Sequence, residues 1–171
     1  MSDQFNIEIP EDDNLPRRVC KDCGWIDYVN PKIVVGAVCT FEDRFLMCRR
    51  AIEPRKGYWT FPAGFLELDE STEDGARREV REEACAEVEI DRLLAVYSLP
   101  HVGHIQIMYT ARMLSPDFAA GPESLDVKLV TWDEIPWEDL AFRTVRWALR
   151  HFDEVKGREA FSAFSNPEPI E

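Results

Sequence analysis

The sequence predicts a mixed α/β domain, and three observations lead to this fold class. Runs rich in β-branched and aromatic residues, separated by short polar turns, occur both early and late in the chain. Between them, from Ser71 to about Cys85, the spacing of apolar residues changes to a helical period. A second amphipathic helix pattern covers Trp137 to about Val155. Strands that surround two helices in one chain are typical of a mixed α/β domain.

The individual elements follow in chain order. Residues 1–16 are acidic, contain two prolines and are expected to form a flexible arm. Residues 17–31 hold a turn-like Cys20-Lys-Asp-Cys23 knuckle. The first two strands are expected to form a hairpin around Glu42-Asp43. The predicted strands and extended segments are residues 32–41, 44–50, 58–67, 88–99, 104–114 and 126–132.

These elements divide the chain into three parts. An N-terminal extension covers residues 1–31, and the main domain covers residues 32–156. Residues 157–171 form a polar tail with two prolines, which is expected to be mobile.

Composition and charge exclude several classes of protein. The chain has 171 residues and a net charge of −13, so it should not bind a nucleic-acid backbone non-specifically. It has no apolar run long enough to cross a membrane and no recognisable signal peptide, so we expect neither. Its five cysteines are an odd number, which favours reduced thiols in the cytoplasm over a disulfide framework.

The first helix carries signals at its start and along one side. Ser71 or Thr72 can cap its N-terminus, where the helix dipole favours the acidic residues that follow. One apolar stripe, expected to face the core, consists of Ala76, Val80 and Ala84.

Three carboxylates share another side of this helix, because Glu79, Glu82 and Glu83 are spaced i, i+3, i+4. Helix spacing alone favours a solvated face, with neighbouring arginines offsetting the charge. The alternative is a site for a hard cation such as Mg²⁺, which prefers carboxylate oxygens and substrate phosphates.

The surrounding residues favour the cation site. The segment from Gly64 to Ala86, GFLELDESTEDGARREVREEACA, resembles the Nudix box, G-x5-E-x7-R-E-U-x-E-E-x-G-U, in which U is a bulky aliphatic residue. Two positions depart from the pattern, since Cys85 replaces the glycine and Ala86 replaces the aliphatic residue. The positions in register are Gly64, Glu70, Arg78, Glu79, Val80, Glu82 and Glu83.

The resemblance implies a Nudix hydrolase. It implies the fold of that family, an α/β/α sandwich with a mixed β-sheet. It also implies an enzyme that uses Mg²⁺ or Mn²⁺ to split a nucleoside diphosphate linked to another group. The products would be a nucleotide and a phosphorylated second product.

The resemblance also assigns roles to residues. Arg78 and Glu70 would form a pair that orients the glutamates. One glutamate would also act on the attacking water. The metal ligands would be Glu79, Glu82, Glu83 and the backbone carbonyl of Gly64. Because the empty site would hold repelling carboxylates, added Mg²⁺ or Mn²⁺ should raise the stability of the protein.

The N-terminal extension resembles the zinc-ribbon-like segment that precedes the Nudix domain in a bacterial and plant subgroup. That segment has two cysteine pairs, whereas this chain has only Cys20 and Cys23. Structural zinc normally takes four ligands. We therefore expect a knuckle without metal, and the alternative is a zinc ion shared between the two chains of a homodimer.

The subgroup implies ADP-ribose or FAD as the substrate. NADH is less favoured, because AVYSLPHVGHIQIMY departs from the run that marks the NADH enzymes. Several residues are candidates for contact with the small-molecule nucleotide. Arg49 or its neighbour Arg50 would meet a phosphate. Tyr58 would stack on a ring, and Glu123 would add a metal ligand or a base.

Each of these candidates has a structural alternative, namely surface pairing, core packing or a solvated loop. A second hypothesis for the whole chain is a Nudix-fold module that senses a nucleotide without cleaving it. The presence of all the box glutamates favours the enzyme.

Overall fold

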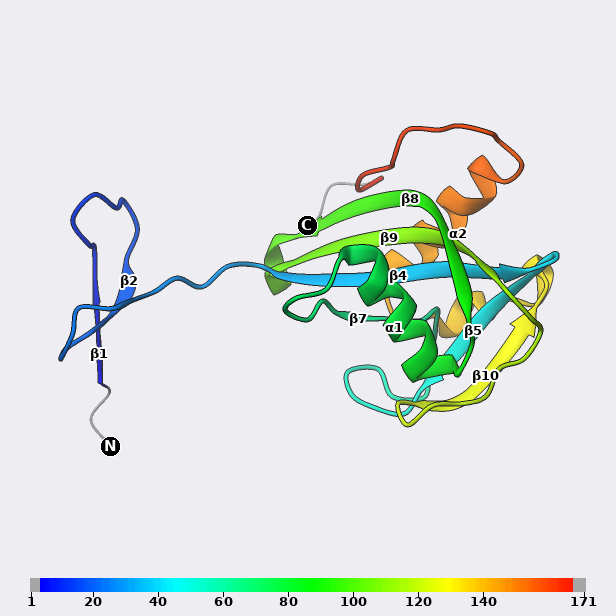
Figure 1. Ribbon diagram of the computed structural model, residues 1–171, viewed down its shortest axis with the longest axis horizontal. Coiled ribbons are helices and arrows are strands. Elements are labelled where there is room, and N and C mark those ends of the chain that lie inside the picture. The colour runs from blue at the N-terminus through cyan, green and yellow to red at the C-terminus, as the bar shows by residue number, and fades with distance from the viewer. Residues whose placement is uncertain (1–3, 168–171) are drawn as a thin grey trace. The chain divides into compact units, whose positions relative to one another are not determined.

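The structure is a computed structural model that describes residues 4–167 (Figure 1). The ends of the predicted arm and tail, residues 1–3 and 168–171, lie outside the described residues. The chain divides into two units, Met1–Pro31 and Lys32–Glu171. Across residues 4–167, no helix has the length and apolar character needed to cross a membrane.

The first unit contains a three-stranded antiparallel sheet of β1 (Phe5–Glu8), β2 (Arg17–Cys20) and β3 (Ile26–Asp27). The expectation of a flexible arm is therefore wrong for β1. Residues distant in sequence contact this strand. The Arg18 guanidinium lies 4.6 Å from the centre of the Phe5 ring, and the Trp25 ring meets Phe5 edge-on at 6.3 Å. Such cross-strand contacts stabilise a short strand that composition alone does not reveal.

The second unit is built on a seven-stranded sheet in the order β10-β5-β4-β9-β8, with β6 paired to β5 and β7 paired to β4. The central β4 and β9 run parallel and the other pairs run antiparallel, so the sheet is mixed as the resemblance implies. The strands are β4 (Lys32–Phe41), β5 (Arg44–Arg50), β6 (Trp59–Thr60), β7 (Ala63–Phe65), β8 (Val88–Leu99), β9 (His104–Met113) and β10 (Ser124–Val130).

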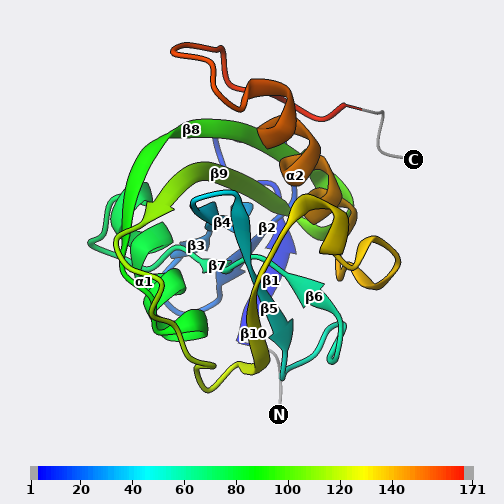
Figure 2. The same ribbon diagram turned by 90° about the vertical axis from the view of Figure 1, so that its right-hand side faces the viewer.

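Two helices cover opposite faces of this sheet, α1 (Thr72–Ala84) and α2 (Arg143–Val155) (Figure 2). Each face has its own hydrophobic core. The predicted stripe of α1 is buried against strand residues such as Val35 and Leu46. On the other face, α2 packs residues such as Trp147 and Leu149 against β8 and β4. The α/β/α sandwich predicted from the sequence is thus confirmed.

The second helix starts later than its pattern predicts. Short 3₁₀ turns occupy Trp132–Glu134 and Trp137–Asp139, and the α-helix begins only at Arg143. Leu140 forms a bridge with Trp59, and the N–H of Ala141 donates to the Trp59 carbonyl at 2.8 Å. This pairing with a distant strand holds residue 140 extended, so the amphipathic pattern before it does not become helix. A third 3₁₀ turn, Pro100–Val102, joins β8 to β9.

The segment after α2 is ordered rather than mobile as far as Asn166. Phe164 exchanges backbone hydrogen bonds with β8, donating to the Leu94 carbonyl and accepting from the Val96 N–H, both at 2.9 Å. Its ring stacks on His151 at 4.1 Å, and the Asn166 amide bonds to the backbone of Ser98. The expectation of a free tail is therefore wrong for this stretch. Its aromatic residues find partners on β8 and α2 that are distant in sequence.

The helix α1 begins and ends at identifiable residues. The Ser71 side chain accepts a hydrogen bond from the N–H of Asp74, as its N-cap position predicts. At the other end, Cys85 adopts the left-handed conformation with φ 47°, and its N–H donates to the Arg81 carbonyl. The cysteine therefore keeps the helix stop that the family's glycine provides, but at the conformational cost that a side chain carries there.

The substitution Cys85→Gly should stabilise the protein by about 1 kcal/mol, because glycine adopts positive φ without steric strain. Part of the gain is offset by the greater freedom of glycine in the unfolded chain. Cys85 is exposed, so no core packing is lost. Urea unfolding of the two proteins measures the difference, and a lower midpoint for the glycine variant would contradict the strain.

Candidate functional site

The glutamates of α1 differ in their burial. Glu79 and Glu83 are only 7% and 5% exposed, whereas the Glu82 side chain is 56% exposed. A spacing of four residues brings Glu79 and Glu83 under the same strands, while Glu82 is turned toward solvent. Two buried carboxylates so close together, beside a third, are not a solvated helix face.

Arg78 connects the carboxylates of this site. Its Nε and Nη2 donate to the two oxygens of Glu70 at 3.0 and 2.8 Å, which is a bidentate pair. Its Nη1 donates to Glu79 at 2.6 Å and to Glu82 at 3.0 Å. The remaining Nη2 bond goes to the Phe65 carbonyl at 2.9 Å. One guanidinium therefore connects Phe65 and Glu70, near the start of the box, with two of the three glutamates on α1.

The charge of this network shows in its pKa values. Hydrogen bonds from Arg78, and then from the backbone of Glu67, lower the pKa of Glu70 to about 2. The pKa of Arg78 is raised, chiefly by Glu70. Both groups are therefore ionised at neutral pH.

Gly64 leaves room for a carboxylate. It lies in β7 opposite Val35, and a Cβ built on it would lie 2.4 Å from Oε2 of Glu79. Any side chain at position 64 would displace that carboxylate. The box requires glycine here because the backbone and Glu79 approach each other closely.

Glu83 carries the strongest sign of a missing partner. Its Oε2 is buried and accepts no hydrogen bond within the described residues. Burial, and then the charge of Glu79, raise the pKa of Glu83 to about 8, although Arg50 and the N–H of Ala63 act against the shift. Burial also raises the pKa of Glu79. When Glu83 is ionised, its Oε2 needs a cation or a hydrogen-bond donor that residues 4–167 do not supply.

These shifts predict how the stability of the metal-free protein depends on pH. Glu83 keeps its proton in the folded state up to about pH 8, whereas its ordinary pKa is 4.5. Unfolding between these values releases a proton, so the free energy of unfolding should fall by on the order of a few kcal/mol as pH rises from about 5 to 8. Burial lowers the pKa of His151, which acts in the opposite direction below pH 6.5.

The contribution of Glu83 is isolated by comparing wild type with Glu83→Gln in a chelating buffer. The unfolding midpoint of the variant should be less sensitive to pH over this range. Parallel pH profiles for the two proteins would show that Glu83 is ionised in the folded state.

A loop after β9 closes the C-terminal end of α1. The N–H groups of Ala119 and Gly121 donate to the carbonyls of Ala84 and Glu83 at 2.9 and 3.1 Å. These bonds satisfy carbonyls that every helix end leaves free. The same loop brings Glu123 close enough to raise the pKa of both Glu79 and Glu83. The loop glutamate therefore lies within electrostatic range of the two buried helix glutamates.

The two arginines that end β5 lie on different faces of the sheet. Met47 belongs to the core under α2 and Cys48 to the core under α1, so Arg50 shares the α1 face and Arg49 does not. Arg50 lowers the pKa of Glu83 and has no carboxylate within ion-pair distance among residues 4–167. Strand alternation could have singled out Arg50 from the sequence.

The side chains of Arg49 and Tyr58, both predicted nucleotide contacts, lie against the loop that follows β5. Arg49 donates to the Gly57 carbonyl at 2.9 Å. Tyr58 is on the neighbouring loop with the Arg55 guanidinium 5.3 Å from its ring centre. The structure therefore groups these two side chains with the loop at residues 51–57.

The site suits a divalent cation in part. Among residues 4–167, no three His, Cys, Asp or Glu side chains already converge as a metal cluster, because Arg78 draws Glu79 and Glu82 toward itself. The unpartnered Glu83 oxygen and the close approach of Gly64 to Glu79 nevertheless leave oxygen ligands of the kind that Mg²⁺ and Mn²⁺ prefer. The residues present therefore fit such an ion, with a shift of side chains on binding.

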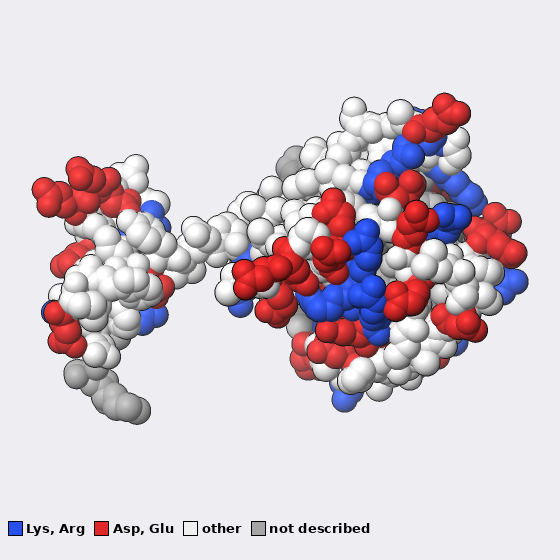
Figure 3. Space-filling view, in the orientation of Figure 1, with Lys and Arg blue, Asp and Glu red and all other residues white. Residues whose placement is uncertain are grey.

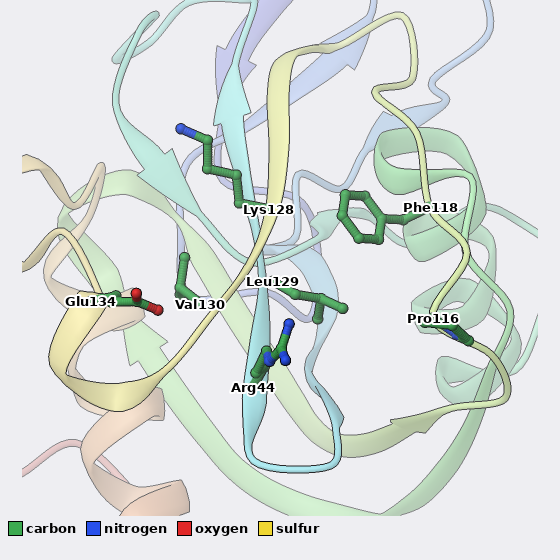
Figure 4. A pocket seen from close by; sticks show the side chains of 7 residues that line it. All are labelled: Arg44, Pro116, Phe118, Lys128, Leu129, Val130 and Glu134. Atoms are coloured by element: carbon green, nitrogen blue, oxygen red, sulfur yellow. The ribbon is translucent and has the colours of Figure 1, made fainter.

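Two surface features lie apart from this site. A hollow of about 600 Å³ straddles β10 (Figure 4), and none of its lining residues is a predicted site residue. On the face that carries α1, basic side chains are interleaved with acidic ones (Figure 3), as in the pairs Arg77–Asp74 and Arg81–Glu87 at 2.7 and 2.9 Å. That face offers no continuous basic surface to a nucleic acid.

The N-terminal knuckle brings its two thiols together. Backbone N–H groups of Asp22 and Cys23, and then the Cys23 thiol, lower the pKa of Cys20. Gly24 closes the turn in the left-handed region, and its N–H donates to the Cys20 carbonyl at 3.0 Å. Cys20 and Cys23 supply half of a tetrahedral zinc ligand set, and no third cysteine or histidine occurs in residues 4–31.

Comparison with family models gives two matches. The model described as NUDIX domain matches residues 30–152. A zinc-ribbon model described as Nudix N-terminal matches residues 3–29. Together they cover both units of the chain.

Two curated relatives are similar over the main domain. An ADP-ribose pyrophosphatase of Methanocaldococcus jannaschii is 27% identical over 113 residues, which are 64% of this chain and 67% of the relative. A MutT-like protein of Streptomyces ambofaciens is 36% identical over 102 residues, which are 60% of this chain and 64% of the relative. The matched part thus spans about two thirds of each relative's length.

Solved structures agree with the fold. A NUDIX hydrolase from Nitrosomonas europaea superposes with a TM-score of 0.89 at 44% identity, over 94% of this chain and 92% of that one. An ADP-ribose pyrophosphatase from Streptococcus suis gives a TM-score of 0.67 at 24% identity, over 80% of this chain and 100% of that one, and shows the fold alone.

Proposed function

The chain belongs to the Nudix family and is a Nudix hydrolase, and on this premise we propose that it hydrolyses the pyrophosphate bond of ADP-ribose, with FAD as the alternative substrate. Water would add to one phosphorus while the bridging P–O bond to the other phosphate breaks. ADP-ribose would then give AMP and ribose 5-phosphate, and FAD would give AMP and FMN.

The observation that carries this proposal is the buried Glu79–Glu83 pair beside Gly64, with one Glu83 oxygen left without a partner. A folded protein retains such a costly arrangement where a cation completes it. Arg78 supports the proposal, because it fixes Glu79 and Glu82 in a defined orientation.

The residues of the site take separate roles in the proposed reaction. Glu79, Glu83 and the Gly64 carbonyl would hold a divalent cation, with the exposed Glu82 available for a second. A bound Mg²⁺ or Mn²⁺ neutralises the pyrophosphate and lowers the pKa of the attacking water. Arg50 lowers the pKa of Glu83, and its Nε donates to the Pro54 carbonyl at 2.9 Å. Because it has no ion-pair partner among residues 4–167, its remaining N–H groups are proposed to bind a phosphate of the substrate.

Glu123 is proposed to accept a proton from the attacking water or to add a metal ligand, and the effect of its charge on both buried glutamates supports this role. Arg49 and Tyr58, near the loop at residues 51–57, are proposed to contact the distal part of the nucleotide. ADP-ribose is preferred because the Methanocaldococcus relative is named an ADP-ribose pyrophosphatase.

The test is an assay of the purified protein with ADP-ribose, FAD, NADH and diadenosine polyphosphates, each with Mg²⁺ or Mn²⁺, followed by chromatography of the products. AMP from ADP-ribose, lost on chelation of the metal, is the expected result. A ligand-induced rise in melting temperature without any product would instead support a nucleotide-sensing module.

We also propose a cellular location and an oligomeric state for the protein. The five free thiols favour a reducing, cytoplasmic location. A homodimer is proposed from the family resemblance and is checked by light scattering. Zinc at Cys20 and Cys23 would need two further ligands, and metal analysis of the purified protein measures whether it is there.

A further inference from the structure

Three buried side-chain atoms of the described residues lack a hydrogen-bond partner. They are Oε2 of Glu83, Oε1 of Gln106 and Oγ of Ser124. Carboxylate and amide oxygens only accept hydrogen bonds, whereas a hydroxyl also donates one. Buried polar groups are nearly always paired, so Ser124 stands out as an unused donor in a region that contains an unused acceptor.

Ser124 and Glu83 have a common neighbour, the buried thiol of Cys48. Cys48 lies in the core under α1, and β10 pairs with β5 so that Ser124 stands opposite Arg50, on the same face of the sheet as Cys48. The pKa of Cys48 agrees with this placement, since the charge of Glu83 raises it and the Ser124 hydroxyl lowers it. The Ser124 hydroxyl acts on the Cys48 thiol and lowers its pKa, but sulfur is a weak acceptor and this contact lacks the geometry of a hydrogen bond, because Ser124 Oγ has no partner among residues 4–167. The donor of Ser124 is therefore available to Glu83.

The backbone holds Ser124 against the end of α1. Its N–H donates to the Gly121 carbonyl at 3.0 Å, and the N–H of Gly121 donates to the Glu83 carbonyl at 3.1 Å. The contact is so close that a Cβ on Gly121 would lie 1.7 Å from the Glu82 carbonyl oxygen. Because these backbone bonds complete the turn, the hydroxyl of Ser124 is not needed for it.

We propose that Ser124 is a positioning residue for the cation site, an inference that rests on the proposed function. Its hydroxyl donates to a single bound water, and that water donates to Oε2 of Glu83. A direct bond is absent, and a buried water commonly makes about three hydrogen bonds in a polar site of this kind. The ionised carboxylate then has a donor on its second oxygen and one fixed orientation toward the cation.

The experiment measures Mn²⁺ binding to the metal-free full chain, without nucleotide, from the electron paramagnetic resonance signal of free Mn²⁺. Ser124→Ala should weaken binding by roughly tenfold, as loss of a residue that supports a metal ligand commonly does. In the Glu83→Gln background, Ser124→Ala should cause no further loss, because the group through which it acts is gone.

Two further variants keep the result interpretable. Thr144→Ala removes a buried hydroxyl from α2, on the other face of the sheet, and should leave Mn²⁺ affinity unchanged. Ser124→Cys keeps the side-chain volume but donates weakly, so it should show the same loss even if the alanine variant fails to fold.

Mn²⁺ affinity within twofold of wild type for both Ser124 variants would overturn the proposal. An equal loss in the wild-type and Glu83→Gln backgrounds would overturn it too, since that marks a general structural effect. Absence of Mn²⁺ binding by the wild type would instead refute the proposed cation site, and the inference with it.

Discussion

Glu83→Gln should lower the rate of pyrophosphate hydrolysis by about 10³-fold or more, on the scale of losing a positioned charged group at a reaction centre. Glutamine has the same shape but cannot ionise, so it offers a cation one neutral oxygen in place of a carboxylate. Glu83 is 5% exposed, and its Oε2 has no hydrogen-bond partner among residues 4–167, so this oxygen is free for a cation.

The same substitution should make the metal-free protein more stable at about pH 8. The pKa of Glu83 is raised to about 8, so the wild type keeps a costly group there that is partly ionised and buried. Glutamine removes that cost. Loss of activity together with a gain in stability is the signature of a group retained for function.

Initial rates with ADP-ribose and melting temperatures in a chelating buffer test both effects. Glu87→Gln is the matched control, because Glu87 is exposed and its carboxylate pairs, within residues 4–167, with Arg81 alone. A variant with full activity, or one that is inactive and also less stable than wild type at pH 8, would argue against this role for Glu83.

The sequence predicts the parts of the fold that local patterns encode. The limits of β4, β5 and β8 match the runs of β-branched and aromatic residues, and α1 matches its cap and its apolar stripe. The pairing of Arg78 with Glu70, which the resemblance to the Nudix box implies, is present in the structure. In each case the signal lies within a few residues of the element that it predicts.

What the sequence does not predict depends on residues far apart in the chain. The strand β1, the late start of α2 and the order of the segment around Phe164 all require contacts with a distant partner. The side-chain environments follow the same rule. The unpartnered atoms of Glu83 and Ser124 come together only because the loop before β10 docks on the end of α1.

Arg78→Lys should lower hydrolysis by about 10- to 100-fold, the usual range for residues that orient metal ligands. Arg78 forms five hydrogen bonds from three nitrogens, to Glu70, Glu79, Glu82 and the Phe65 carbonyl. Lysine keeps the charge but has a single nitrogen, so it cannot span these acceptors. A loss of hydrolysis in the lysine variant would therefore be due to the hydrogen-bond geometry of Arg78 and not to its positive charge.

Acid unfolding provides a second measurement on the same variant. Arg78 lowers the pKa of Glu70 to about 2 from 4.5, so the stability from this pair is complete above about pH 4.5 and is lost as pH falls toward 2. With lysine, the pKa of Glu70 should rise, and acid unfolding should begin at a higher pH.

Arg77→Lys is the control, because Arg77 forms an exposed pair with Asp74. It should change the hydrolysis rate by no more than about twofold and leave the pH at which acid unfolding begins unchanged. Equal effects of the two substitutions would mean that positive charge on α1 is sufficient. A selective effect of Arg78→Lys would show that the planar guanidinium is needed. It binds Glu70 with two nitrogens and holds Glu79 and Glu82 with the third, and the proposed cation site requires this fixed arrangement.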